Sequence, residues 1–564
     1  MKRNLWKFFS FRKKQDIALD EIFLDSSNIS GLNIDQFEGH LEKPISKYSV
    51  LAMATGFFLV FIVILIKSWM LQVREGEAYA ILSEKNRLRH HPIFAERGVI
   101  YDRKEMELGW NVVHTTEDFF FRKYSEEAGL SHVVGYVNYP KRDSSGIFYQ
   151  TEIVGKSGIE KVYNTELAGQ SGTQIVETDA LQNIQSASVM RRPVAGTNLH
   201  MSIDAEVQKK LYSVIQDLAG RVGFDAGAGV IMDVRTGELL ALTSYPEFSS
   251  TILATATDTA AIAKYQLDDH KPFLNRVVSG LYTPGSIMKP FFALAALNEG
   301  IISPTKQILS TGSISIQNPY DPDKKTVFPD WKAHGYVDMR RALAMSSNVY
   351  FYEIGGGYQD QKGLGITKIE EYARLFGFGK EVGINIAPEP PGVIPSPAWK
   401  KENFEDGVWR LGDTYHTAIG QYGFQVSPLQ VVRAFAAIAN DGKILQPSLL
   451  KRPDGWKAEG VQLAISQEHF KVVKEGMRAV VTEGTGQGLS FPDVHIAGKT
   501  GTAQVGVSKQ FVNSWAVGFF PYENPHYAFA VVMEHGPVKN LIGGVFVVNQ
   551  LINWMRIYTP EYLK

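Results

Sequence analysis

Cysteine is missing from all 564 residues of the sequence. Its absence excludes disulfide bonds, a catalytic thiolate and any metal site built on thiolates, although it does not indicate a compartment. An excess of either charge is missing too, because 58 Lys and Arg balance 59 Asp and Glu. A general nucleic-acid-binding protein would show a basic excess, so we expect no nucleic-acid partner. Internal repeats and low-complexity tracts are also absent.

The apolar content that is present is ordinary for folded protein, at 44% hydrophobic residues, and the length allows several domains. One stretch is far more apolar than the rest, since residues 48–66 contain no charged side chain. A helix of this length spans roughly 28 Å, which matches the hydrocarbon core of a bilayer. The sequence therefore predicts one transmembrane helix over 48–66. A cleaved signal peptide would begin closer to the N-terminus.

The charges beside this helix favour one orientation. The first fifteen residues are rich in Lys and Arg and contain no acidic residue, and Lys43 and Lys47 flank the helix on the same side. Lys67 and Arg74 on the far side reduce this asymmetry. Because basic segments tend to stay in the cytoplasm, we expect residues 1–47 to form a short, flexible cytoplasmic tail. The residues after the helix would then lie outside the cytoplasm.

A domain boundary is predicted near residue 200. Residues 71–88 have a helical composition, and residues 96–103 form an apolar, β-prone run that ends in turn residues and predicts a strand. We expect a β-rich domain over 67–200. Residues 227–234 and 238–244 then form a hairpin pattern around Arg235-Thr236-Gly237. An antiparallel hairpin followed by helices indicates an α+β domain over 201–564, with an antiparallel sheet flanked by helices. Further helices are expected at 205–218, 368–376, 428–440, 467–482 and 545–557, and further strands at 514–520 and 527–534.

A Pro-Gly turn followed by the apolar residues 291–297 predicts a buried helix that begins near Gly285. Ser286 and Lys289 stand three residues apart, which places a hydroxyl and an amine on one face of the first helical turn. A serine becomes a good nucleophile when a neutral base lies within hydrogen-bond reach. The partial positive charge of the helix N-terminus and burial both favour neutral Lys289. Ser-x-x-Lys is common by chance, so the pair alone indicates little.

Two further motifs follow in the chain. Ser346-Ser347-Asn348 lies sixty residues after Ser286, and Lys499-Thr500-Gly501-Thr502 lies 153 residues further on. Either motif alone could be a helix cap or a strand with a turn. In this order, the three motifs resemble the set found in penicillin-binding proteins and β-lactamases. The Ser-Ser-Asn form resembles the class B transpeptidases.

The N-terminal half carries a second resemblance, at residues 96–103, 132–136 and 155–160. These stretches are similar to motifs in the N-terminal module of class B penicillin-binding proteins, although ordinary strand-ending turns would also explain their glycines. The resemblance runs from about residue 70 to near 550. It implies that residues 67–200 form a non-catalytic pedestal or dimerisation domain, which holds the catalytic domain away from the membrane and contacts partners.

The resemblance implies roles in acyl transfer for five side chains. Ser286 would attack the terminal D-Ala-D-Ala bond of a peptidoglycan stem peptide and expel D-Ala, with Lys289 as the base. Ser346 would relay a proton to the leaving nitrogen, and Asn348 would hold the substrate amide or Lys289. Lys499 would bind the terminal carboxylate of the substrate.

The residues around Lys499 complete the site that the resemblance implies. The Thr500 and Thr502 hydroxyls would bind the same carboxylate, and Gly501 would let the substrate backbone lie close to the strand. The backbone N–H groups of Ser286 and Thr502 would form the oxyanion hole. No cofactor and no metal are implied. Some elongation-type relatives place zinc nearby with a cysteine that this chain lacks, so we expect His334 to be an ordinary hydrogen-bonding residue.

The same resemblance implies the partners and the place of action. An amine from a neighbouring stem peptide would resolve the acyl-enzyme and form the cross-link, and β-lactam antibiotics would acylate the same serine. Expected protein partners are a membrane-embedded glycosyltransferase and other cell-wall elongation proteins. The chain would cross the bacterial inner membrane once. Only about 130 residues separate the helix from the domain boundary, too few for a glycosyltransferase domain of its own.

Several alternatives are open on the sequence. Residues 351–355 and Trp409-x-x-Gly412-Asp413-Thr414 favour penicillin-binding protein 2 of cell elongation, and the septal, division-type transpeptidase is the alternative. The long pedestal disfavours a tethered β-lactamase or D,D-carboxypeptidase. The short cytoplasmic tail disfavours a β-lactam sensor. A catalytically silent scaffold should have lost the serine or the lysines of the three motifs.

Overall fold

The computed structural model describes residues 46–80, 88–115, 117–144, 148–178, 184–318, 321–506, 508–540 and 542–564. The chain forms two compact units, residues 1–87 and residues 88–564. The described part of the first unit contains helix α1 (Lys47–Trp69), which continues through the π-helical turn η4 (Met70–Arg74).

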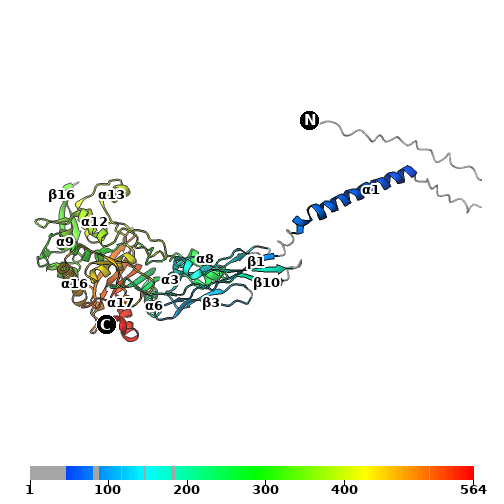
Figure 1. Cartoon of the computed structure of the whole chain (residues 1–564). Helices are drawn as coiled ribbons and strands as arrows, with labels where there is room; N and C mark the ends of the chain where they lie inside the picture. The colour runs from blue at the N-terminus through cyan, green and yellow to red at the C-terminus, as the bar shows by residue number, and fades with distance from the viewer. Residues whose placement is uncertain are drawn as a thin grey trace, which may run out of the picture. The chain divides into compact units, whose positions relative to one another are not determined.

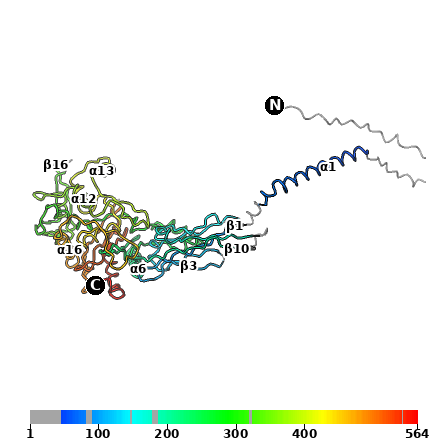
Figure 2. Tube along the Cα trace, viewed as in Figure 1, coloured from blue at the N-terminus to red at the C-terminus, as the bar shows by residue number. Residues whose placement is uncertain are grey.

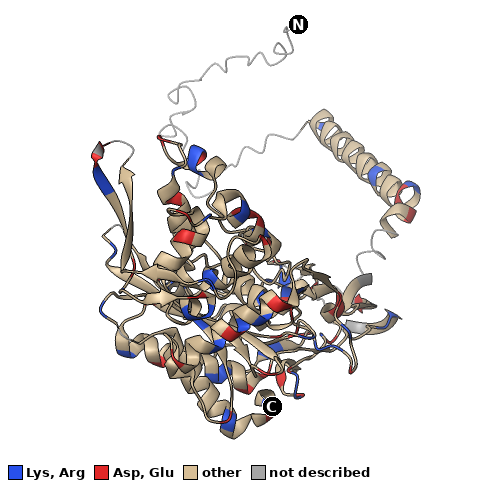
Figure 3. Ribbon diagram, turned by 90° about the vertical axis from the view of Figure 1, so that its left-hand side faces the viewer, with Lys and Arg blue, Asp and Glu red and all other residues tan. Residues whose placement is uncertain are grey.

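Helix α1 has the properties of a membrane-spanning helix. The Ser46 side chain accepts a hydrogen bond from the Tyr48 N–H and caps its N-terminus. With η4 it forms 28 residues, within which an 18-residue window has a mean hydropathy of 2.8. Its charged residues are Lys47, Lys67 and Arg74, so the stretch between Lys47 and Lys67 carries no charge (Figure 3). Within the described part of the chain it is the one helix long and apolar enough to cross a bilayer. The tail predicted over 1–47 lies outside the described residues except for its last two positions.

Strands dominate the start of the second unit, and we call residues 88–200 the pedestal (Figures 1 and 2). One sheet has the order β1-β9-β10 and is antiparallel. The other has the order β11-β2-β3-β4, in which only β11 is parallel to its neighbour. Their bounds are β1 (Leu88–Ile93), β2 (Ile100–Tyr101), β3 (Glu107–Val112), β4 (Phe121–Tyr124), β9 (Gly172–Thr178), β10 (Ile184–Arg191) and β11 (Leu199–His200). The predicted β-rich character of this region is confirmed.

Shorter strands and helices connect β4 to β9 along the chain. Two short antiparallel pairs, β5–β8 and β6–β7, lie between β4 and β9 with three one-turn helices. Their bounds are α3 (Ser131–Val134), β5 (Val137–Asn138), β6 (Lys141–Arg142), β7 (Phe148–Gln150), β8 (Val154–Gly155), α4 (Gly158–Val162) and α5 (Asn164–Ala168).

A buried carboxylate and a close backbone contact bring the three pedestal motifs together. Glu160 is fully buried, and its two oxygens lie 2.6 Å from Arg97 Nε and 2.7 Å from Arg122 Nε. A Cβ on Gly135 would lie 1.9 Å from the carbonyl oxygen of Ser157. The glycine is therefore required by a close backbone approach, which an ordinary strand-ending turn would not need. The motifs act as one cluster although they are up to about sixty residues apart.

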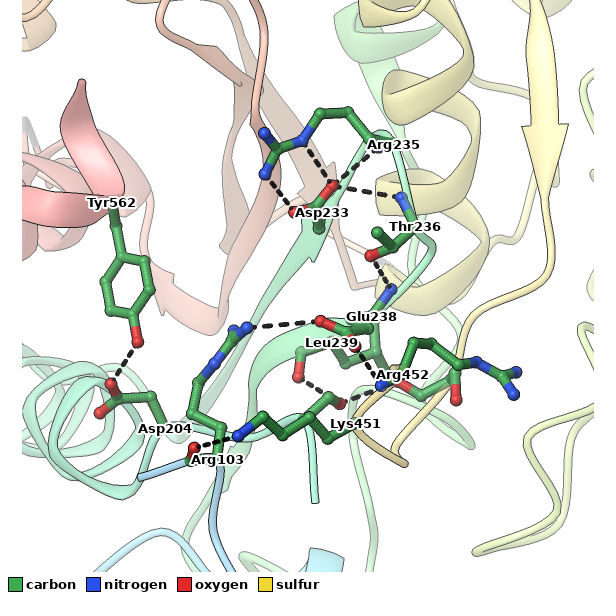
Figure 4. Close-up of polar contacts among 12 residues, drawn as sticks. Arg103, Asp204, Asp233, Arg235, Thr236, Glu238, Leu239, Lys451, Arg452 and Tyr562 are labelled. Atoms are coloured by element: carbon green, nitrogen blue, oxygen red, sulfur yellow. Dashed lines mark hydrogen bonds and ion pairs between the residues drawn. The ribbon is translucent and has the colours of Figure 1, made fainter. Parts of the chain in front are cut away.

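Polar contacts join the pedestal to the chain beyond residue 200, and Figure 4 draws several of them. Asp102 Oδ2 accepts the Ala205 N–H at 3.1 Å, at the start of α6 (Ala205–Val222). Arg103 Nη2 lies 3.3 Å from Glu238 Oε2, and Lys451 Nζ donates to the Arg103 carbonyl at 3.0 Å. One pedestal turn thus contacts three separate segments. Because both parts pack as one unit, the boundary near residue 200 stays a prediction.

A five-stranded antiparallel sheet organises residues 201–564. Its order is β13-β12-β22-β21-β20, so β20 is an outer strand. The predicted hairpin is confirmed, because β12 and β13 pair antiparallel. The strands are β12 (Ala226–Asp233), β13 (Leu239–Tyr245), β20 (Ala497–Val505), β21 (Phe511–Phe520) and β22 (Tyr527–Pro537). The strands expected at 514–520 and 527–534 lie within β21 and β22.

Helices cover both faces of this sheet. Alternate residues of β22 face opposite sides, so Ala530 and Val532 belong to one hydrophobic cluster while Phe529 and Val531 belong to the other. The first cluster contains residues of α9 (Lys289–Asn298) and α15 (Pro428–Ala439). The second contains residues of α6 and α17 (Gly544–Tyr558). With α12 (Gly365–Leu375) and α16 (Gln467–Thr482), the expected helices are present, with ends that differ by a few residues.

The remaining elements lie in the connections between these strands and helices. They are α7 (Ser250–Thr255), α8 (Thr259–Leu267), η5 (Gly285–Met288), β14 (Ile308–Ser310), β15 (Ser313–Asn318), β16 (Asp321–Pro329), β17 (Gly335–Val337), α10 (Met339–Ala344), α11 (Asn348–Gly356), α13 (Pro397–Asn403), α14 (Leu411–Ala418), β18 (Lys443–Leu445), β19 (Gly460–Gln462), η6 (Gln487–Leu489) and η7 (Pro560–Leu563).

The pedestal cluster yields a stability prediction. Glu160→Gln leaves two buried guanidinium groups without a counter-charge, which costs about 3–5 kcal/mol in comparable buried pairs. We expect the thermal midpoint of the detergent-solubilised protein to fall by at least about 4 °C. The exposed pair Asp217–Arg221 provides the control, because exposed ion pairs contribute little. Equal shifts for Glu160→Gln and Asp217→Asn would contradict a structural role for the buried cluster.

Candidate active site

Ser286 lies on a tight turn that leads into a buried helix. The turn η5 is a 3-10 helix, and α9 follows it directly. Side chains three residues apart eclipse each other in a 3-10 helix, so Ser286 and Lys289 share a side of the turn. The predicted buried helix near Gly285 is confirmed, but its first turn is tighter than an α-helix. Residues 289–297 are all buried.

A second loop packs closely against this turn. The Gly285 N–H donates to the Gly420 carbonyl at 2.8 Å. Gly420 has φ +73°, and a Cβ there would lie 2.2 Å from the Gly285 carbonyl oxygen. The glycine is needed for both its backbone angle and its lack of a side chain. This contact fixes the position of the nucleophile turn against the loop at Gly420.

The Ser-Ser-Asn motif lies between α10 and α11, and Lys289 bonds directly to it. Lys289 Nζ donates to the Ser346 carbonyl at 2.7 Å, to the Ser346 hydroxyl at 3.3 Å and to Asn348 Oδ1 at 2.7 Å. Ser346 has φ +54°, which is strained for a residue with a side chain. Ser347 caps α11 by accepting the Tyr350 N–H. The motif thus surrounds the amine with acceptors.

Lys499 reaches the same hydroxyl from the outer strand β20. Its Nζ lies 2.9 Å from Ser346 Oγ and 3.0 Å from the Thr500 carbonyl. The Ser346 hydroxyl therefore lies between two buried amines. Neither amine has a carboxylate partner among the described residues. A proton can move along Lys289, Ser346 and Lys499 without crossing open space.

Burial changes the pKa values of both lysines. It lowers the pKa of Lys289 to about 7, and the Asp330 carboxylate opposes this shift. Burial also lowers the pKa of Lys499, and the nearby Lys289 charge lowers it further. Two ammonium ions so close to one hydroxyl repel each other, so the pair holds one proton more readily than two. One amine is then neutral and able to act as a base.

Strand β20 brings its backbone close to the nucleophile turn. A Cβ on Gly501 would lie 3.0 Å from the Pro284 carbonyl oxygen and 2.9 Å from Ile287 Cγ2. The hydroxyls of Thr500 and Thr485 lie 2.6 Å apart beside it. The tight packing leaves room for backbone alone at position 501.

A cleft of about 620 Å³ opens over these groups. It is lined by residues of all three motifs: Ser286, Ser346, Asn348, Thr500, Gly501 and Thr502. Lys289 and Lys499 are buried and bond to Ser346 at the cleft wall. The structure therefore brings every residue of the predicted site together, from segments more than two hundred residues apart.

Other parts of the cleft wall were not predicted. Ile542, Phe546 and Asn549 contribute from the C-terminal helix region, and Trp331 contributes from the loop before the Ser-Ser-Asn motif. Asp330, next to Trp331, was also missed, although its carboxylate contacts the motif from behind. No motif marks its role, because its contacts with Ser347 and Val349 form only in the folded chain.

His334 differs from expectation. Its side chain is 1% exposed, and neither ring nitrogen makes a hydrogen bond. Nε2 lies 3.6 Å from Asp330 Oδ1, beyond hydrogen-bond length, and the ring packs edge-on against Trp331. Burial lowers the pKa of His334, which favours the neutral ring. Among the described residues no three His, Asp or Glu side chains gather as metal ligands, and the predicted lack of a metal stays a prediction.

Comparison with known proteins places this geometry in a family. Residues 227–546 match the model of the penicillin-binding protein transpeptidase domain. Residues 113–201 match the model of the penicillin-binding protein dimerisation domain. The first match covers more than half of the chain.

Several similar curated proteins carry the name peptidoglycan D,D-transpeptidase MrdA. Peptidoglycan D,D-transpeptidase MrdA of Acinetobacter baumannii is 34% identical over 74% of this chain and 63% of its own length. The chain thus spans less than two thirds of that relative. MrdA of Salmonella typhimurium is 30% identical over 75% of this chain and 70% of its own length.

Solved structures show the same fold. The penicillin-binding protein PBP2 of Helicobacter pylori, solved in complex with MreC, superposes with a TM-score of 0.70 at 26% identity. The match covers 84% of this chain and 99% of that one. PBP2 of Pseudomonas aeruginosa, in complex with WCK 5153, has a TM-score of 0.67 at 28% identity over 84% of this chain and 98% of its own.

The Gly420–Gly285 contact yields a prediction. Gly420→Ala would push the nucleophile turn away, so we expect the rate of labelling by a fluorescent penicillin to fall at least tenfold. Gly300→Ala is the matched control, because Gly300 also has positive φ but a Cβ added there would meet no atom within 4 Å. Both variants lose about 1–2 kcal/mol from the left-handed backbone. Equal labelling rates would show that the contact does not position the serine.

Proposed function

Because this chain belongs to the penicillin-binding protein transpeptidases, as a class B protein of the penicillin-binding protein 2 type, we propose that it is a serine D,D-transpeptidase that cross-links peptidoglycan stem peptides. The observation that carries this proposal is the Ser346 hydroxyl, held within 3.3 Å of Lys289 Nζ and 2.9 Å of Lys499 Nζ. Such a shared hydroxyl can move protons between the two steps of an acyl transfer.

In the first step Ser286 is the nucleophile. Neutral Lys289 takes the proton of the Ser286 hydroxyl as the serine oxygen attacks the carbonyl of the terminal D-Ala-D-Ala bond. The carbon–nitrogen bond then breaks, and Ser346 relays a proton to the leaving nitrogen. Free D-Ala departs and an ester with Ser286 remains. Asn348 orients Lys289 through its 2.7 Å hydrogen bond.

Lys499 and β20 bind the end of the donor peptide. A carboxylate beside Lys499 raises the pKa of that amine, so the proton shared by the pair settles on Lys499. The restored charge then disfavours protonation of Lys289, which prepares the base as the substrate arrives. The Thr500 and Thr502 hydroxyls bind the same carboxylate. The backbone N–H groups of Ser286 and Thr502 stabilise the oxyanion, and the close packing at Gly501 supports this placement.

The second step forms the cross-link. An amine of a neighbouring stem peptide attacks the ester, and the new carbon–nitrogen bond forms as the bond to the Ser286 oxygen breaks. The surplus amine proton passes along Ser346 and Lys289 to the Ser286 oxygen and restores its hydroxyl. β-Lactams acylate the same serine. The cleft of about 620 Å³ has room for two peptide ends beside the serine.

We further propose that the chain acts at the cytoplasmic membrane in cell elongation. Helix α1 anchors it, the N-terminus lies in the cytoplasm, and residues 88–564 lie outside. The names of its relatives support the elongation role over septal division. The complex of the Helicobacter pylori relative with MreC supports an elongation partner of that kind. A membrane-embedded glycosyltransferase is the second partner that we propose. Depletion should turn rod-shaped cells round, whereas filaments would support the division role.

The nucleophile assignment has a direct test. Ser286→Ala removes the attacking oxygen, so we expect labelling by a fluorescent penicillin to fall to background, while Ser508→Ala labels like the wild type. Turnover of a D-Ala-D-Ala peptide by the two variants should follow the same order. Labelling of Ser286→Ala at the wild-type rate would defeat the assignment.

The lowered pKa of Lys289 predicts a pH dependence. Neutral Lys289 is the active form, so the acylation rate should fall about tenfold per pH unit below about 7 and level off above it. Lys289→Arg keeps the charge but cannot lose its proton, and should be at least about 1000-fold slower at every pH. The exposed Lys368→Arg is the control. A rate that stays constant between pH 5.5 and 8.5 would contradict Lys289 as the base.

A further inference from the structure

One buried carboxylate near the cleft has no role in these steps. Asp330 follows β16 directly, and its side chain is fully buried. Its carboxylate contacts Ser347 and Val349, and it is not among the residues that line the cleft. An ionised group without access to solvent needs compensating contacts.

Hydrogen bonds from the catalytic turn supply these contacts. Asp330 Oδ2 accepts from the Ser347 hydroxyl at 2.8 Å, from the Val349 N–H at 3.0 Å and from the Ser310 hydroxyl at 3.3 Å. Oδ1 accepts the Trp331 N–H at 2.9 Å. Burial alone would raise the pKa of Asp330, but the bonds from the turn and the Lys289 charge lower it below its usual range. The group is therefore charged at neutral pH.

These bonds hold a strained residue in place. Ser346, with φ +54°, stores on the order of 1–3 kcal/mol of backbone strain, which persists only where neighbours over-determine the conformation. Lys289 holds the turn through the Ser346 carbonyl. Asp330 holds the following residue through Ser347, and its negative charge lies at the N-terminus of α11, where it is favoured. Lys289 and Asp330 thus hold the turn through two separate hydrogen bonds.

The charge of Asp330 also acts on the base. Among the described residues, Asp330 is the one carboxylate that raises the pKa of Lys289, and it opposes the lowering of that pKa by burial. The other ionisable groups around Asp330 are His334 and Lys332 from the loop that follows it and Tyr352 on α11. Lys499 on β20 faces Lys289 from the opposite side. Removal of the Asp330 charge would leave Lys289 without this nearby negative charge.

We propose that Asp330 is a positioning residue for acyl transfer, which holds the Ser346 hydroxyl between Lys289 and Lys499 and supplies a nearby negative charge for Lys289. It touches neither the substrate nor the reacting atoms. The inference rests on the proposed function, because it assigns the geometry of that same site.

Asp330→Asn tests the charge with little change in volume. The amide can turn its oxygen toward Ser347 and Val349, so folding should survive. We expect the acylation rate at pH 8 to fall at least tenfold, with kcat for a D-Ala-D-Ala peptide reduced and KM nearly unchanged. The acidic limb of the profile, which is the pH range over which the acylation rate falls as the pH is lowered, should move to lower pH. The reason is that Lys289 loses the neighbour that stabilises its protonated form. A merely structural loss would not move this limb.

Ser347→Ala separates geometry from charge. It removes one bond to Asp330 and keeps the carboxylate, so the rate should fall while the acidic limb stays in place. Asp338→Asn is the matched control, because Asp338 caps α10 by accepting the Arg341 N–H and has the same chemical change. That variant should retain the wild-type rate and profile, with a similar loss of thermal stability.

The outcomes distinguish this inference from the proposed function. A wild-type rate and an unshifted limb for Asp330→Asn would overturn the inference, as would equal effects of Asp330→Asn and Asp338→Asn. If Asp330→Asn fails to fold, a wild-type rate for Ser347→Ala would overturn it. In each case loss of labelling in Ser286→Ala leaves the proposed function standing, whereas labelling of Ser286→Ala would defeat that function first.

Discussion

The shared hydroxyl of Ser346 is the constraint on which the rest of the site depends. Two amines that are almost completely buried point at one oxygen, and neither has a carboxylate partner among the described residues. Water would normally relieve such crowding of positive charge, but burial removes it. The two amines can lower this repulsion by binding one proton fewer, and the amine left neutral is then able to act as a base.

The fold meets this constraint by bringing three rigid elements to one point. Helix α9 carries Lys289, the turn before α11 carries Ser346, and the outer strand β20 carries Lys499. Each is anchored in the core between the sheet and its helices, so small relative movements are resisted by close packing. Because Gly420 and Gly501 have no side chains, the backbones of their loop and strand can pack closely against the nucleophile turn.

Sequence patterns predicted the elements better than the contacts between them. The hairpin and the five helices follow from apolar periodicity, which reflects local burial, and the site residues follow from motif order. The role of Asp330 and the unpaired ring of His334 could not be predicted, because both depend on side chains that only the tertiary structure brings together. The 3-10 geometry at Ser286 likewise reflects packing against Gly420 rather than local propensity.

The position of β20 at the margin of the sheet has a further consequence. An unpaired strand edge exposes backbone donors and acceptors, and such edges promote aggregation unless they are blocked. Here the nucleophile turn lies against Gly501, while Thr502 is exposed over the cleft. The nucleophile turn thus covers part of this edge, and the part that lines the cleft offers backbone groups to which the extended peptide of the proposed function would add as a further strand.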